Sequence, residues 1–423
     1  MMSDGPPTAP LFSSSQRRCH LLLALYLPDT AVTLDSLSLL NGVDQHLVRQ
    51  DIAEVGEEIQ RYHQLDIHSH PDGSLRLRGA ELDLRLCLLH WLRRALRLSP
   101  AFVEQQFAPA IRQWLRACKI EKAVYDEKNL QALIQHCGTR LNRSFTSRDR
   151  QLLQLFMQFS LCQHSYADFT PAQQQWLAAK AERLAAEEVI RHWQKRCKSA
   201  PHPNEIDFYA LLFSIIHAPD IDTIEHENER HLLQSVQLLI QRFQTLSGMH
   251  FNDEGGLTGQ LYTHLAQALD RSHFAIGIDS SLTEEVTRLY PRLLRTTRSA
   301  IAPLENHYGV SFSPQESGLI AIIFGAWLMQ ESAMQEKQVL LLTGDNEVLE
   351  QEIELQLREM TLLPLNIKYL DMYQFQRDGA PKDTALVITP YATPLPLYSP
   401  PLIHAELPLS EKQQRRIRTL LEA

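Results

Sequence analysis

The sequence lacks an apolar run long enough to cross a membrane. Its longest uninterrupted apolar stretch, residues 319–329, is about half of the stretch that a transmembrane helix needs. Residues 17–27 superficially resemble a signal peptide, because two arginines precede an apolar segment, but Pro28 ends that segment early. We therefore expect a cytoplasmic protein without a membrane span.

Cysteine is scarce, and its spacing suggests no bound metal or disulfide. The six cysteines include no CxxC pair, which argues against a zinc site and a disulfide framework. We expect reduced thiols in the protein core. His63, His68 and His70 lie close together beside Asp66, but histidines on a polar turn are usually solvated. We predict no metal site and no cofactor.

Excess positive charge and catalytic signatures are also missing. The 423 residues include 41 Lys and Arg against 50 Asp and Glu, which argues against a protein that coats nucleic acid but permits one basic face. The chain contains no glycine-rich phosphate loop, no GxSxG motif and no HExxH motif. We therefore expect a folded protein of several domains that is not an enzyme.

The first 80 residues carry the pattern of a winged helix-turn-helix. Residues 1–15, rich in proline and serine, are expected to be a disordered leader. Within residues 16–80, apolar spacing predicts three helices, and two alternating segments around Pro71, Asp72 and Gly73 predict a β-hairpin. Three helices followed by a hairpin indicate a winged helix.

This segment resembles the winged helix-turn-helix of bacterial sugar-operon regulators. In those proteins a stretch similar to residues 48–52 begins the recognition helix, and a strand similar to residues 73–77 forms the wing. The resemblance implies that the helix enters the major groove and that the wing contacts phosphate. The candidate DNA contacts are Gln45, His46, Arg49, Gln50, Arg76 and Arg78.

The acidity of the same segment supports an alternative. Residues 1–80 hold six Lys or Arg against ten Asp or Glu, and the third helix itself contains Asp51, Glu54, Glu57 and Glu58. Neutralisation of phosphate charge supplies most non-specific DNA affinity. A winged helix that binds protein, or that no longer binds DNA, therefore remains open.

Helical patterns fill the middle of the chain. Residues 81–98 predict a basic amphipathic connector helix whose arginines form a solvated face. Two helical modules follow at residues 99–219 and 231–331. The acidic, proline-marked segment 220–230 between them is expected to be a linker.

The two modules share a pattern of histidine, arginine and glutamate. In the second module, His264 and Arg271 are seven residues apart, which places them on one face of a helix, two turns apart. An apolar helix opened by Glu316 follows, with Ser313 as a plausible N-cap. The first module repeats the pattern, which indicates a duplicated helical module. The corresponding residues there are His136, Arg143 and Glu205.

After residue 331 the periodicity changes. Short apolar segments at 339–344, 365–370, 385–389 and 402–407 predict strands, and residues 348–360 and 410–421 predict helices. Alternating strands and helices indicate a small parallel α/β domain over residues 337–423.

The repeated histidine helix with its downstream glutamate helix resembles the PRD, the phosphotransferase-system regulation domain of bacterial antiterminators and sugar-operon activators. A winged helix, two PRDs and an α/β domain similar to the sugar-transport enzyme IIB unit are typical of the mannitol-operon regulator type. The resemblance implies a mainly α fold, a homodimer through the PRD modules, and phosphorylation by phosphotransferase-system proteins. It implies His264 and His136 as phosphoacceptors, with Arg271 and Arg143 supporting the phosphate.

The departures from this family pattern concern the acceptor residues. The second phosphoacceptor position, seven residues after the glutamate, holds Ile323 in one module and Leu212 in the other. The loop after the first predicted strand, residues 339–345, contains no cysteine, so thiolate chemistry is excluded there. The resemblance thus implies largely degenerate phosphoregulation.

We predict a DNA-binding transcriptional regulator with two PRD modules. The alternative is a scaffold that interacts with phosphotransferase-system components or with another regulator without binding DNA. An RNA-binding antiterminator is disfavoured, because that class begins with a small β-rich RNA-binding domain and this chain begins with helices.

Overall fold

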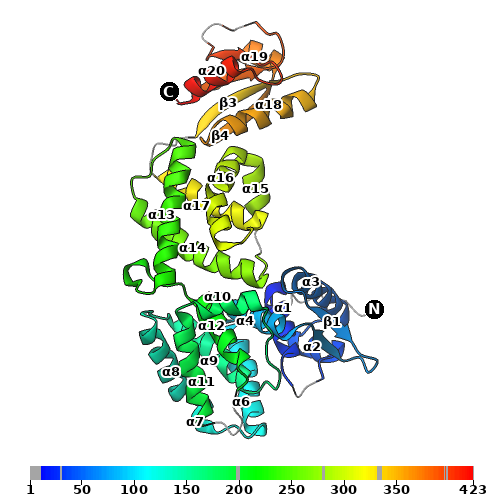
Figure 1. Cartoon of the computed structure of the whole chain (residues 1–423). Helices are drawn as coiled ribbons and strands as arrows, with labels where there is room; N and C mark the ends of the chain where they lie inside the picture. Colours follow the sequence, from blue (N-terminus) through cyan, green and yellow to red (C-terminus); the bar gives the residue numbers. More distant parts are fainter. Residues whose placement is uncertain are drawn as a thin grey trace, which may run out of the picture. The chain divides into compact units, whose positions relative to one another are not determined.

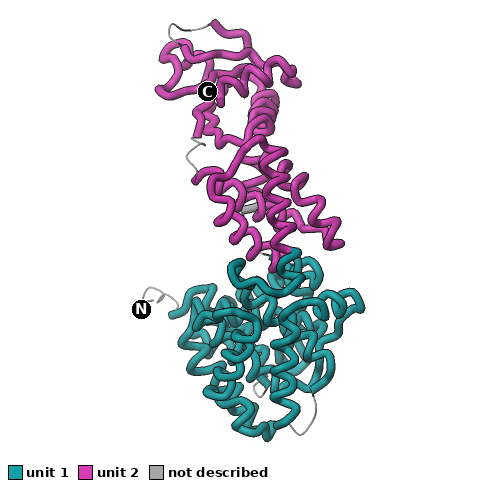
Figure 2. The backbone as a smooth tube through the Cα atoms, turned by 60° about the vertical axis from the view of Figure 1, so that its left-hand side comes forward, with its two compact units in different colours: residues 1–231, 269–278 teal, residues 232–268, 279–423 magenta. Residues whose placement is uncertain are grey.

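The computed structural model describes residues 11–28, 31–196, 201–278, 282–330, 336–394, 396 and 399–422 (Figure 1). The chain is mainly helical with a small parallel sheet near its C-terminus, as predicted. It divides into two compact units, residues 1–231 with 269–278, and residues 232–268 with 279–423 (Figure 2). Across the described residues, no helix combines the length and apolar character of a membrane span.

The N-terminal head contains the predicted three helices and hairpin. Each helix begins after a side chain that accepts a hydrogen bond from a backbone N–H three residues later, namely Ser13, Thr33 or Asp44. The hairpin pairs antiparallel, with Asp66 opposite Arg78. The elements are α1 (Ser14–Leu25), α2 (Leu34–Asn41), α3 (Gln45–His63), β1 (Asp66–Ser69) and β2 (Leu75–Arg78).

Helix α1 begins inside the segment that the sequence predicts to be a disordered leader. Ser13 and Gln16 cap each other reciprocally, so that helical order begins at Ser14. Residues 1–10 of the predicted leader lie outside the described residues.

The first unit continues as a set of packed helices. One hydrophobic core runs from Cys19 in the head through Trp91 to Ile216, so the head and the first module share their buried surface. The elements are α4 (Glu81–Leu98), α5 (Pro100–Phe102), η1 (Val103–Phe107), α6 (Ala108–Ala117), α7 (Lys122–Tyr125), α8 (Glu127–Arg140), α9 (Ser147–Leu161), α10 (Pro171–Ala178), α11 (Glu182–Gln194), α12 (Asn204–Ile216) and η2 (Ile221–Thr223).

Helix α4 corrects the prediction of a connector with solvated arginines. Arg85 is 2% exposed and pairs with Glu81 and Glu205, each at 2.9 Å. Arg94 pairs with Glu58 of α3 at 2.6 Å. Arg93 and Arg97 are exposed as predicted, so the correction concerns Arg85 and Arg94, which carboxylates of α12 and α3 meet.

The last turns of the helix that carries His264 belong to the first unit. Asp270 has no exposed surface and accepts hydrogen bonds from Trp176 Nε1 and Lys180 Nζ, both at 3.0 Å, and from Ser214 Oγ at 2.5 Å. The His273 ring stacks on Trp176 with centroids 4.0 Å apart. The first unit therefore includes residues 269–278 in addition to the chain up to residue 231, which ends next to the predicted linker.

The second unit begins with a five-helix module. Helix α17 is buried on most sides, as its unbroken apolar run predicts, and Phe324 stacks on Phe243 of α13 with ring centroids 4.0 Å apart. The elements are α13 (Glu227–Ser247), α14 (Glu254–Phe274), α15 (Leu282–Leu289), α16 (Pro291–Tyr308) and α17 (Pro314–Gln330).

A parallel four-stranded sheet with the order β4-β3-β5-β6 forms the C-terminal domain. Helices α18 and α20 cover one face, where Ile353 and Ile417 meet Leu341, and α19 covers the other face through Phe375. The sequence did not predict α19. The elements are β3 (Lys337–Thr343), α18 (Glu347–Met360), β4 (Leu365–Asp371), α19 (Met372–Asp378), β5 (Thr384–Thr389), β6 (Leu402–His404) and α20 (Glu411–Glu422).

The Asp270 cluster should be a major source of stability in the first unit. We expect Asp270→Ala to lower the free energy of unfolding by about 3 kcal/mol, because it leaves the Lys180 ammonium buried without its carboxylate. Urea denaturation followed by tryptophan fluorescence measures this, since Trp176 is part of the cluster. Asp222→Ala, an exposed aspartate, is the matched control, and an equal loss in both variants would contradict the assignment.

The head should lose stability in mild acid. Burial, with help from His90 and Arg94, lowers the pKa of His63 from 6.5 to about 3. Between these values the unfolded chain binds a proton that the folded chain excludes, so stability falls as pH drops below 6.5, by up to about 1.4 kcal/mol per pH unit. Thermal melts between pH 7 and pH 5 should show a shallower decline for His63→Leu than for wild type. Identical slopes would contradict the prediction.

Candidate functional site

The second module brings His264 and Glu316 together from two helices. His264 Nε2 on α14 lies 3.2 Å from Glu316 Oε2 at the start of α17, and the side chains are 17% and 5% exposed. Ser313 Oγ accepts a hydrogen bond from the Glu316 backbone N–H at 3.2 Å, which holds the carboxylate in the first turn of the helix. The sequence pattern included both His264 and Glu316, but it did not predict that their side chains are in contact.

The contact between His264 and Glu316 is an electrostatic interaction and not a well-aligned hydrogen bond. The distance is within hydrogen-bonding range, but the ring nitrogen is not aligned for a hydrogen bond to the carboxylate. A phosphoryl group on Nε2 would therefore meet a carboxylate of the same sign at close range. This geometry orients the imidazole and opposes phosphorylation at that nitrogen.

Arg271 lies on the same helix as His264, two turns further along, as the seven-residue spacing predicts. The position equivalent to a second phosphoacceptor, Ile323, is 9% exposed in α17. Its counterpart in the first module, Leu212 in α12, is fully buried. Both positions serve the hydrophobic core.

His136 in the first module has a different environment. Its Nε2 lies 3.6 Å from Glu188 Oε2, and its side chain is 54% exposed. Arg191 and Arg140 reach the same carboxylate at 2.7 Å and 3.9 Å. The cations nearest to His136 are therefore Arg140 and Arg191, which the sequence analysis did not single out.

Arg143 points away from the His136 environment. Helix α8 ends at Arg140, and Asn142 takes a left-handed conformation with φ of 52°, so that Arg143 N–H donates back to the Gly138 carbonyl at 2.9 Å. The turn directs the Arg143 guanidinium into the core, where it pairs with Glu182 at 2.7 Å and Glu229 at 3.0 Å. Spacing alone implied one helical face, but the chain leaves the helix first.

Buried charges reinforce one another around Arg143. Burial opposes the charge of this guanidinium, yet Glu182 and Glu229 raise its pKa above the ordinary value. Burial likewise opposes the charge of Glu182, but Arg143 and Lys180 lower the pKa of that carboxyl. The Glu205 carboxylate is also occupied, because it pairs with Arg85. Arg143 thus acts as a structural cation in this fold.

Comparison with known proteins places the chain in a family. A profile described as "PRD domain" matches residues 237–327, and a profile described as "Stationary phase-inducible protein CsiE, C-terminal domain" matches residues 337–421. The whole chain is 50% identical over 426 residues to Stationary phase-inducible protein CsiE of Escherichia coli (strain K12), with 100% of each chain covered. The chain belongs to the CsiE family.

In this CsiE-family chain the PRD match covers the second module, which confirms a PRD there and includes the His264 and Glu316 pair. A regulatory role follows from the family and from the PRD. That the first module is a second PRD stays a prediction.

The loop after β3 is where an enzyme IIB unit would carry its cysteine. In this chain, side chains of the same domain form hydrogen bonds with that loop. Glu350 is 3% exposed and accepts hydrogen bonds from the Gly344 backbone N–H at 2.6 Å and from the Tyr391 hydroxyl at 2.9 Å. The Asn346 N–H donates to the same hydroxyl at 2.9 Å. Glu350 and Tyr391 thus bind the backbone N–H groups of this loop.

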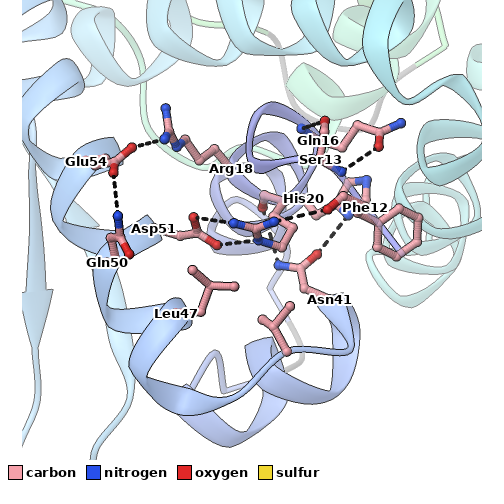
Figure 3. Close-up of polar contacts among 12 residues, drawn as sticks. Phe12, Ser13, Gln16, Arg18, His20, Asn41, Leu47, Gln50, Asp51 and Glu54 are labelled. Carbon is pink, nitrogen blue, oxygen red and sulfur yellow. Dashed lines mark hydrogen bonds and ion pairs between the residues drawn. The ribbon is translucent and has the colours of Figure 1, made fainter. Parts of the chain in front are cut away.

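In the head of this CsiE-family chain, three of the four acidic residues of α3 pair with arginines, and one of the three, Asp51, is buried. Asp51 pairs with Arg17 at 2.8 Å, and Glu58 pairs with Arg94. Figure 3 shows Glu54 between Arg18 and Gln50. Asp51, Glu54 and Glu58 are therefore neutralised by arginines, whereas Glu57 is exposed.

The predicted DNA contacts lie on the N-terminal half of α3 and on β2, and one of them, Gln50, donates to Glu54 one turn along α3 at 3.3 Å. All six residues are exposed, and two of them, Gln45 and Gln50, donate to the carboxylates of Asp35 and Glu54. Arg78 pairs with Asp66 across the hairpin at 2.7 Å, which partly neutralises its charge. The residues are Gln45, His46, Arg49, Gln50, Arg76 and Arg78.

Removing the negative charge of Glu316 should make His264 a better phosphoacceptor. With purified phosphotransferase relay proteins, we expect Glu316→Gln to raise phosphoryl incorporation at least about tenfold. A tenfold change corresponds to the removal of about 1.4 kcal/mol of repulsion between the carboxylate and the phosphoryl group. Radiolabel transfer followed by peptide mapping measures it.

The double variant His264→Ala with Glu316→Gln is the control and should take up no label at this site. Equal incorporation with and without His264 would remove it as an acceptor. Equal incorporation with and without Glu316 would show that the carboxylate is no barrier.

Proposed function

We propose that this protein is a transcriptional regulator that binds DNA through α3 and the wing. The observation that carries the proposal is the pairing of Asp51, Glu54 and Glu58 with arginines of α1 and α4. Because these carboxylates are neutralised inside the head, the exposed face of α3 presents His46, Arg49 and Gln50 to a partner. This face carries one cation, Arg49, and polar side chains that can meet a polyanion.

The readout and the backbone contact are assigned to different residues. Gln50 and Arg49 carry side chains that can donate to base edges in the major groove. Arg76 is exposed on β2 and supplies a cation for the phosphate backbone. Arg78 contributes less, since Asp66 already accepts its guanidinium.

Control is assigned to the PRD modules with phosphoregulation largely lost. The second phosphoacceptor positions are aliphatic, and the first acceptor of the second module faces Glu316. The proposed partners are DNA, phosphotransferase-system proteins and a second copy of the chain, bound through the PRD modules. The proposed location is the cytoplasm, and no catalytic step is part of this function.

A salt-titrated DNA-binding measurement on the full chain tests this proposal. The full chain is required because the head shares its core with the first module. We expect Arg76→Ala to weaken binding to all duplexes and to reduce the slope of log affinity against log salt by about 1. Arg49→Ala and Gln50→Ala should weaken binding to a selected site by about 1–3 kcal/mol each.

Arg112→Ala, an exposed arginine on α6 outside the head, is the matched control and should leave affinity unchanged. A flat salt dependence of the wild type, or absence of binding at low salt, would make the scaffold without DNA binding the better account.

A further inference from the structure

Two cysteines in the first unit lie at the ends of neighbouring helices. Cys118 is the C-cap of α6, and Cys162 is the C-cap of α9. One turn earlier on each helix, the Trp114 and Phe159 rings pack edge to face with centroids 5.9 Å apart. The ends of α6 and α9 therefore meet, and burial together with the neighbouring Cys118 thiol raises the pKa of Cys162.

The two thiols differ in their access to solvent. Cys118 is partly exposed, whereas Cys162 is 1% exposed and points its thiol at the Gln158 carbonyl, 3.7 Å away. Both thiols are free. Burial raises the pKa of Cys162 to about 12, so Cys162 is the thiol that reacts more slowly with an external oxidant.

We infer that Cys118 and Cys162 form a disulfide in response to hydroperoxides. The Cys118 thiolate attacks the peroxide, so that a sulfur–oxygen bond forms, the oxygen–oxygen bond breaks, and water or an alcohol leaves. Cys162 sulfur then attacks Cys118 sulfur. The sulfur–sulfur bond forms, the sulfur–oxygen bond breaks, and the departing hydroxide takes the Cys162 proton as water. The peroxide gains the two electrons that the thiols lose.

The cross-link would restrain the helix on which the head rests. Helix α9 packs against α4, and its Phe159 ring meets Tyr26 of α1 with centroids 6.0 Å apart. Gln158 donates to the Tyr125 carbonyl at 2.9 Å, which ties the same helix to α7. A bond between positions 118 and 162 would close a long loop and so lower the conformational entropy of the unfolded chain, which stabilises the folded state.

The experiment treats the full-length reduced protein with hydrogen peroxide, blocks free thiols with an alkylating reagent and maps peptides without reduction. We expect a peptide pair joined through Cys118 and Cys162, which dithiothreitol separates. The oxidised protein should also melt at a higher temperature than the reduced protein. Oxidation to sulfinic acid at Cys118, with Cys162 still alkylated, would overturn the inference.

The variant Cys118→Ser supplies the control, because the substitution is at a partly exposed cap and is expected to preserve the fold. In this variant Cys162 should stay reduced under the same peroxide treatment, and the melting temperature should not rise. Equal oxidation of Cys162 with and without Cys118 would contradict the inference. A cross-link from Cys118 to Cys197 or to a second molecule would contradict it as well.

Discussion

Charge removed from water has to be met by opposite charge, and this constraint organises the first unit. Apart from Arg85 and Glu81, which share α4, its buried cations come from elements far apart in the chain from the carboxylates that they meet. Each pairing therefore fixes which helices pack together, in a way that apolar contacts alone would specify less sharply. The pairs are Arg17 with Asp51, Arg85 with Glu81 and Glu205, Arg143 with Glu182 and Glu229, and Lys180 with Asp270.

The same constraint separates the two histidines that the sequence pattern treats alike. In both modules a histidine helix precedes an apolar helix led by glutamate. In the second module Glu316 has His264 as a neighbour, whereas in the first module Glu205 has Arg85. His136 is consequently left at the surface with Glu188. The two histidines therefore have different partners, although the sequence pattern around them is the same.

Sequence reasoning succeeded where local pattern decides structure. The strands from β3 to β6, the wing hairpin and the buried helix α17 follow from apolar periodicity and turn residues. It failed where one residue changes the path of the backbone. Asn142 ends α8 before Arg143, and α19 is a short helix without strong periodicity. Residue spacing predicts neither the end of α8 nor the short helix α19, because each involves too few residues to show a period.

The sequence by itself determined the family-type order of the chain: a helical head with a hairpin, two helical modules and a parallel α/β domain, with no cysteine where thiolate chemistry would need one. These properties depend on residue identity and on periods of two and 3.6 residues. Only the tertiary structure decided which charges meet, that Glu316 faces His264, that Asp51 turns inward and that Asp270 belongs to the first unit. Such pairings join distant positions, and burial rather than spacing selects the partner.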